Sequence, residues 1–136
     1  MTISLNPIGQ LALAPRDVDR AEAFYGEAPG LRKLYRFGDP LFYDCAGIRL
    51  MIETARDPDR FTSGTTIYFR CADLALTRRA LIDRGVVFKD EPHRIARMED
   101  HDLWMTFFDD SDGNPLAPMQ EAPRDHDPRP ARARSS

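Results

Sequence analysis

The chain has 136 residues, of which 42% are hydrophobic and 30% are charged, so it suits one compact domain with a core. The formal net charge of -3 and the scattered Lys and Arg residues give no basic surface, so we expect no nucleic-acid partner. No apolar run approaches the roughly 20 residues that span a bilayer, and the first residues lack the pattern of a signal peptide. We therefore expect a cytoplasmic protein with no membrane partner. The widely spaced Cys45 and Cys71 agree with a reducing compartment.

The first half of the chain predicts a strand, a helix and three further strands. Residues 8–14 alternate apolar and small or polar side chains, which is typical of a half-buried strand. Asp17 stands at the N-cap of a short helix that ends at Pro29-Gly30. Strand-like runs follow at residues 31–37, 41–45 and 48–54. We assign about residues 7–54 to a first module.

The second half repeats this order after a polar connector at residues 55–64. A strand at residues 66–71 leads through Asp73 into a helix that runs to Arg84 and stops at Gly85. The later strands are predicted at 86–88, 103–108 and 115–120, and residues 94–98 extend the first of them or form a separate segment. We assign about residues 65–120 to a second module and residues 1–121 to one domain. Residues 122–136, rich in Pro, Arg and Asp, predict a disordered tail.

These two modules carry a family resemblance. The run from Ile8 to Tyr25, together with Asp-Gly-Asn-Pro-Leu in residues 109–120, resembles the vicinal oxygen chelate superfamily of glyoxalases, bleomycin resistance proteins and extradiol dioxygenases. The resemblance covers about residues 7–121. It implies an α+β fold in which two tandem βαβββ modules form an open mixed sheet around a cleft. It also implies a homodimer, because members of the superfamily often pair modules between two chains. Function does not follow from this fold alone, since the superfamily hosts both enzymes and binding proteins.

The resemblance marks four strand positions at which metal enzymes of the superfamily carry His or Glu ligands. In this chain the four positions are occupied by Gln10, Met51, Thr66 and Ala117. A slip of one or two residues would bring Glu53 into the place of Met51. Such a set lacks anionic charge and most donor atoms, so we predict no metal and no other cofactor. His93 and His101 lie outside these positions, although the pair could meet across a hairpin and hold a relocated metal.

Strand alternation predicts which side chains line the cleft. If the four marked positions face inward, so do their neighbours two residues away on the same strands. The predicted ligand-binding residues on these strands are Gln10, Arg49, Met51, Thr66, Tyr68, Arg70 and Ala117. They mix apolar bulk with polar groups, as a pocket for a small organic ligand requires. Arg49 and Arg70 suit a carboxylate or phosphate. The alternative for Arg49 is a structural ion pair with Glu53 or a neighbouring strand.

Three further residues are candidates for chemistry. Trp104, the only Trp, is predicted near the cleft mouth, where it would stack on a planar ligand or simply pack in the core. His101 and Glu53 are the candidate acid and base. We therefore keep two hypotheses. The first is a metal-independent protein that binds a small organic molecule in the cleft between the modules. The second is a lyase, isomerase or dioxygenase that uses a relocated metal or a metal-free acid and base.

Overall fold

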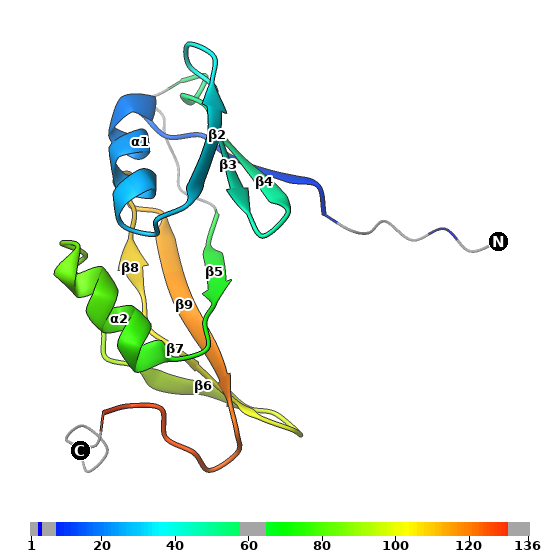
Figure 1. Cartoon of the computed structure of the whole chain (residues 1–136), viewed down its shortest axis with the longest axis vertical. Coiled ribbons are helices and arrows are strands. Elements are labelled where there is room, and N and C mark those ends of the chain that lie inside the picture. Colours follow the sequence, from blue (N-terminus) through cyan, green and yellow to red (C-terminus); the bar gives the residue numbers. More distant parts are fainter. Residues whose placement is uncertain (1–2, 4–7, 58–64, 131–136) are drawn as a thin grey trace. The chain divides into compact units, whose positions relative to one another are not determined.

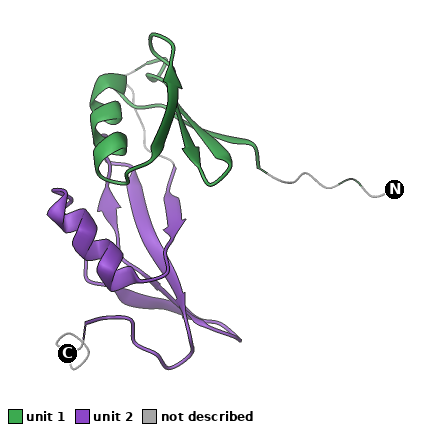
Figure 2. Cartoon of the chain, viewed as in Figure 1, with its two compact units in different colours: residues 1–63 green, residues 64–136 purple. Residues whose placement is uncertain are grey.

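The structure, a computed structural model, describes residues 3, 8–57 and 65–130 (Figure 1). It divides into two compact units, residues 1–63 and 64–136 (Figure 2). The boundary falls close to the connector that the sequence predicts between the modules. We call the two units module one and module two.

Module one is a four-stranded sheet with one helix. Its elements are β1 (Gln10–Leu13), α1 (Val18–Glu27), β2 (Arg32–Arg36), β3 (Leu41–Cys45) and β4 (Ile48–Ile52). The strand order is β1-β4-β3-β2, in which β1 runs parallel to β4 and the other neighbours are antiparallel. The parallel pair follows from the chain path, because α1 and the hairpins of β2, β3 and β4 separate the two strands.

Module two repeats this arrangement. Its elements are β5 (Ile67–Arg70), α2 (Leu74–Asp83), β6 (His93–Arg97), β7 (Asp102–Met105), β8 (Phe108–Asp109) and β9 (Pro115–Ala122). The order β5-β9-β7-β6 matches that of module one, with β5 parallel to β9 and the short β8 paired to β9. Both modules also shift register at the same place, after Lys33 in β2 and after Arg94 in β6. The predicted α+β fold of two βαβββ modules is confirmed.

Two predicted strands of module two differ from the structure. Residues 86–88 form no strand, and only Phe88 makes an isolated bridge, to Phe108. The predicted strand 103–108 divides into β7 and β8, because the side chain of Asp90 intervenes. Its Oδ1 accepts hydrogen bonds from the Thr106 hydroxyl at 2.7 Å and from the Phe107 backbone N–H at 2.9 Å. These bonds replace the ladder contacts that would have continued the strand.

Both helices begin and end where the sequence predicts. The Asp17 carboxylate accepts from the backbone N–H groups of Asp19 and Arg20, and the Asp73 carboxylate accepts from that of Leu76. Gly85, just past α2, has a φ of 93°, which a residue with a Cβ rarely adopts. Each helix has 10 residues, and no helix in the described part of the chain is long and apolar enough to cross a membrane.

Apolar side chains on one face of each sheet form the cores beneath the helices. In module one the largest fully buried side chains are those of Tyr25, Leu41, Tyr43 and Ile52, and in module two those of Leu74, Phe108 and Leu116. Leu11, which alternation also predicts on the helix side, is 41% exposed. It lies on β1, an edge strand of the sheet, where only one neighbouring strand covers it.

The predicted disordered tail is wrong for its first part. Ala122 belongs to β9 and is fully buried. Beyond it, the Asp125 backbone N–H donates to the Asp102 carboxylate at 3.1 Å, and Arg97 forms an ion pair with the Asp125 side chain at 2.6 Å. Composition predicts disorder because this stretch has few apolar residues. Asp125 nevertheless contacts Arg97 of β6 through its carboxylate and Asp102 of β7 through its backbone N–H. Residues 131–136 lie outside the described residues.

Candidate ligand-binding site

The helix-free face of the module-one sheet carries a group of polar and aromatic side chains. In the ladders, Arg49 lies opposite both Gln10 and Asp44, and Met51 lies opposite both Ala12 and Phe42. These rows continue across β2, where Tyr35 pairs with Phe42. We call this group the Arg49 face, and its members are Gln10, Tyr35, Phe42, Arg49 and Met51.

Contacts within the Arg49 face hold the guanidinium in place. Arg49 Nε donates a 2.6 Å hydrogen bond to Gln10 Oε1, and Gln10 Nε2 lies 3.9 Å from the Met51 sulfur. The Arg49 guanidinium carbon lies 5.7 Å from the centre of the Phe42 ring, which is within range of a cation–π interaction. The Phe42 ring in turn lies 4.7 Å from the Tyr35 ring. Arg49 is therefore oriented by an amide and an aromatic surface.

Arg49 forms no ion pair with a carboxylate among the described residues. Asp44, its neighbour in the ladder, pairs with Arg32 at 3.4 Å instead. Glu53, the partner considered from the sequence, is exposed, and its backbone N–H donates to the Leu13 carbonyl. An ion pair of Arg49 with Glu53 is thus absent from the described contacts, although Arg49 does bond to the neighbouring strand through Gln10.

The corresponding face of module two carries Tyr68, Arg70 and Ala117. Tyr68 is 48% exposed, and its ring lies 6.3 Å from that of Phe107. Arg70 forms an ion pair with Glu121 at 3.3 Å, so its charge is already compensated, unlike that of Arg49. Ala117 lies opposite Tyr68 but has no exposed surface, and Thr66 lies just before β5, half-buried. Their contact with a ligand stays a prediction, as does the cleft expected between the modules.

Trp104 is on the other side of its sheet from these residues. It is 8% exposed and belongs to a core cluster with Leu74 of α2 and Ala122. Alternation along β7 explains this position, because Trp104 points opposite to Leu103 and Met105. Trp104 therefore packs beneath α2, and its predicted contact with a ligand at the cleft mouth stays a prediction.

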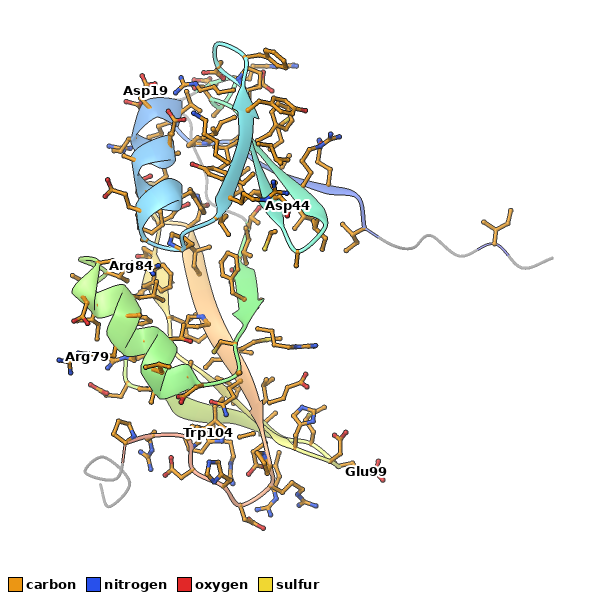
Figure 3. The ribbon with its side chains drawn as sticks, in the orientation of Figure 1. Asp19, Asp44, Arg79, Arg84, Glu99 and Trp104 are labelled. Carbon is orange, nitrogen blue, oxygen red and sulfur yellow. The ribbon has the colours of Figure 1, made fainter. Side chains whose placement is uncertain are left out.

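The histidines of module two do not meet. His93 lies opposite Met105 at one end of the β6–β7 hairpin, whereas His101 lies in the turn at the other end, where Figure 3 shows Glu99 at the tip. His101 Nδ1 is 2.7 Å from the Asp100 carboxylate, and this hydrogen bond lowers the pKa of Asp100. Glu53 belongs to module one, so an acid–base pair of Glu53 with His101 stays a prediction.

The four positions marked for a metal do not fit one. The ladders place Met51 opposite Ala12 and Ala117 opposite Tyr68, so Met51 and Ala117 occupy corresponding places in the two modules. Ala117 has no donor atom, and the amide oxygen of Gln10 already accepts from Arg49. Across the described residues, no three His, Cys, Asp or Glu side chains form a group that would hold a metal ion. The donor set thus lacks the anionic oxygens or imidazoles that a divalent ion requires.

Three aromatic residues of these faces do not follow from the sequence prediction. Tyr35 and Phe42 belong to the Arg49 face, and Phe107 lies near both Tyr68 and His93 in module two. The prediction rests on alternation in the first and last strands of each module. Extending it to β3 would have found Phe42, since Leu41 and Tyr43 are buried on the helix side. Tyr35 was not accessible in this way, because the register shift in β2 changes which residue faces Phe42.

Known proteins share this architecture. A glyoxalase/bleomycin resistance protein/dioxygenase from Alicyclobacillus acidocaldarius is 22% identical over 85% of this chain and 92% of that chain, with a TM-score of 0.69. A second glyoxalase/bleomycin resistance protein/dioxygenase, from Nocardioides, is 17% identical over 93% of this chain and 90% of that chain, with a TM-score of 0.71. A lactoylglutathione lyase from Agrobacterium tumefaciens is 19% identical over 85% of this chain and 94% of that chain, with a TM-score of 0.69. At such low identity these likenesses show the fold alone.

No curated protein matches the chain. Residues 7–117, however, match the family model of the Glyoxalase/Bleomycin resistance protein/Dioxygenase superfamily, and this range spans both βαβββ modules. This match agrees with the fold, in which both modules have the same strand order and pair their first and last strands in parallel. The chain belongs to the glyoxalase/bleomycin resistance protein/dioxygenase superfamily.

Proposed function

We propose that this protein binds a small planar organic anion on the Arg49 face, without a metal. The observation that carries the proposal is the Arg49 guanidinium, which is held by Gln10 and lies over Phe42 yet forms no ion pair with a described carboxylate. A ligand carboxylate would provide that charge, and the Phe42 and Tyr35 rings would provide a surface for its planar part. Charge-assisted hydrogen bonds to Arg are shorter and stronger than neutral ones.

Pre-organisation supports the same proposal. Arg side chains lose rotamer freedom when they bind a ligand, which lowers affinity. Here the hydrogen bond from Arg49 Nε to Gln10 already restricts the side chain and leaves the two terminal nitrogens to donate to a carboxylate. Arg70 on module two, paired with Glu121, lacks this property. We therefore assign anion binding to Arg49.

Benzoate titrated into the protein by isothermal calorimetry tests the anion site. We expect saturable binding by the wild type and an affinity about 10- to 100-fold lower in Arg49→Gln, because a hydrogen bond to a charged group contributes roughly 1.5–3 kcal/mol. Neutral benzamide, which has the same planar ring, should bind more weakly than benzoate to the wild type. The matched control is Arg79→Gln, which removes a charge from a 70% exposed side chain on α2 and should leave the affinity unchanged.

Equal affinities of the wild type and Arg49→Gln for benzoate would contradict the proposal. So would equal binding of benzamide and benzoate, since the anion would then contribute nothing. Circular dichroism of each variant establishes that a lost signal reflects the missing guanidinium and not unfolding.

Metal analysis tests the metal-independent part of the proposal. Protein purified without chelator should contain Fe, Mn, Ni and Zn at well below one ion per chain, because Gln10, Met51, Thr66 and Ala117 offer too few donors. Inductively coupled plasma mass spectrometry measures this directly. A stoichiometric ion that survives dialysis would show that the chain assembles a different metal site.

A further inference from the structure

A pocket of about 340 Å³ lies on the helix side of the module-two sheet. It is lined by Arg94, Asp102, Trp104, Asp125, His126 and Asp127. Asp102 and Trp104 occupy alternate positions on β7 and so point to the same side of the sheet. We propose that this pocket is a second binding site, which takes a small organic cation bearing a guanidinium or ammonium group.

The chain itself shows how a cation fits there. The Arg129 guanidinium carbon lies 5.5 Å from the centre of the Trp104 ring, and the same guanidinium forms hydrogen bonds of 2.7–3.1 Å with the Asp127 carboxylate. Figure 3 shows Trp104 beside this C-terminal segment. An indole face combined with a carboxylate is the arrangement that recognises organic cations. Arg129 is not itself part of the pocket lining, but it contacts two lining residues, Trp104 and Asp127, in the way that a ligand cation would.

The charges around the pocket are consistent with one added cation. Three carboxylates, those of Asp102, Asp125 and Asp127, face three guanidinium groups, those of Arg94, Arg97 and Arg129. When Arg129 moves away from the indole, the remaining groups carry one net negative charge. A single monovalent cation then restores neutrality, whereas an anion would add to the excess. His126 also lines the pocket.

Asp102 and Trp104 are two pocket residues whose buried polar atoms are incompletely satisfied among the described residues. The Asp102 side chain is 2% exposed, and its Oδ1 has no hydrogen-bond partner in the described part of the chain. The nearest cation, Arg97 Nε, is 3.9 Å from Oδ1, which is too long for a hydrogen bond. The Nε1 of Trp104 is also buried without a partner. Such groups cost free energy in the unliganded protein, so an N–H donor near Asp102 gains more than it would at an exposed carboxylate.

Tryptophan fluorescence tests this site selectively, because Trp104 is the only Trp in the chain. We would titrate 1-butylguanidinium, which has the same head group as Arg, at constant ionic strength, and measure quenching of the emission by acrylamide. In Arg129→Ala the ligand should protect Trp104 in a saturable manner. Half-saturation should require about tenfold less ligand than in the wild type, because the wild-type Arg129 competes for the Trp104 ring and the Asp127 carboxylate.

Three controls make the result specific. Arg124→Ala removes the same charge from the same segment, but no described contact joins Arg124 to Trp104 or Asp127, so this variant should behave like the wild type. Butyrate, an anion with a similar chain, should give no saturable protection. Adding Asp127→Asn to Arg129→Ala should weaken 1-butylguanidinium binding severalfold, because it removes one carboxylate of the site.

Absence of saturable protection in Arg129→Ala would overturn the proposal, and so would equal effects of Arg124→Ala and Arg129→Ala. Protection by butyrate at the same concentration would show that charge does not matter. Far-UV circular dichroism establishes that each variant is folded. If Arg129→Ala unfolds, Arg129→Gln takes its place with the same expected outcomes.

Discussion

Glu22 on α1 lies between two cations of β2. Its carboxylate is 2.7 Å from Lys33 Nζ and 2.9 Å from Arg36 Nη1, and its side chain is 29% exposed. The pKa of Glu22 is lowered, most strongly by the hydrogen bond from Lys33. Desolvation raises this pKa in part, and the hydrogen bond from Arg36 lowers it further. Its backbone carbonyl also accepts from the buried Tyr43 hydroxyl, whose pKa is raised by burial. A single residue thus ties the helix to two strands.

Replacing Glu22 with Gln should lower the free energy of unfolding by up to about 1 kcal/mol at pH 7. Because the folded pKa is below its ordinary value of 4.5, this contribution is present above 4.5 and is lost as the pH falls through the lowered pKa. Urea unfolding of both proteins at pH 7 and at acidic pH measures the difference. Glu27→Gln on the same helix is the control, and a Glu22→Gln effect that persists below the lowered pKa would argue against an ionic contribution.

The two helices begin by the same device, an aspartate before the first turn. In α1, Asp17 Oδ1 accepts from Asp19 N at 2.9 Å and from Arg20 N at 3.3 Å. In α2, Asp73 Oδ1 accepts from Leu76 N at 3.0 Å. Each helix has only 10 residues, which is too short to persist without capping and packing on a sheet. The N-cap aspartate therefore fixes where each helix begins, and packing of the helix on its sheet stabilises it.

Asp17→Ala should lower the free energy of unfolding by about 1 kcal/mol, because two backbone N–H groups at the start of α1 lose their acceptor. Asp17→Ser retains a capping oxygen and should recover most of that loss. Chemical denaturation of the three proteins followed by circular dichroism measures both effects. Equal stability of the Ala and Ser variants would show that the carboxylate acts through its charge and not through capping.

At the scale of the whole molecule, the chain is a duplication that has diverged in its side chains. The strand order and the parallel pairs are the same in both modules, and so is the place of the register shift. The polar groups on the two helix-free faces differ, since Arg49 lacks an ionic partner among the described residues whereas Arg70 has Glu121. The two modules thus share their backbone pairing and differ in the charged groups on their helix-free faces.

Homodimer formation is the prediction that belongs to this scale. Edge strands such as β1 and β2, and exposed apolar side chains such as Phe37, 72% exposed, are surfaces that a second copy of the chain would cover. Analytical ultracentrifugation over a range of concentrations should show a species with the mass of two chains. A single species with the mass of one chain at the highest concentration would contradict it, and Phe37→Ser should weaken association if this surface contributes.

The sequence by itself determined the order of elements, their duplication and both helix caps. These follow from local patterns: alternation in residues 8–14, Asp17 and Asp73 before apolar helical spacing, and Gly85 at a helix end. It also identified Gln10, Arg49 and Met51 as members of one face, because β1 and β4 alternate regularly. The shortage of donors at the four marked positions is likewise evident from residue types, since the Ala117 side chain has no donor atom in any conformation.

Only the tertiary structure decided which side chains meet. The contact of Tyr35 with Phe42 depends on the register shift in β2. That contact, like those of Arg49 with Phe42 and of Arg129 with Trp104, joins different strands or distant segments, which no local pattern encodes. The position of Trp104 under α2 and the packing of residues 122–130 against β6 and β7 have the same cause. Long-range pairing is a property of the whole chain, because each contact requires two segments to reach the same place.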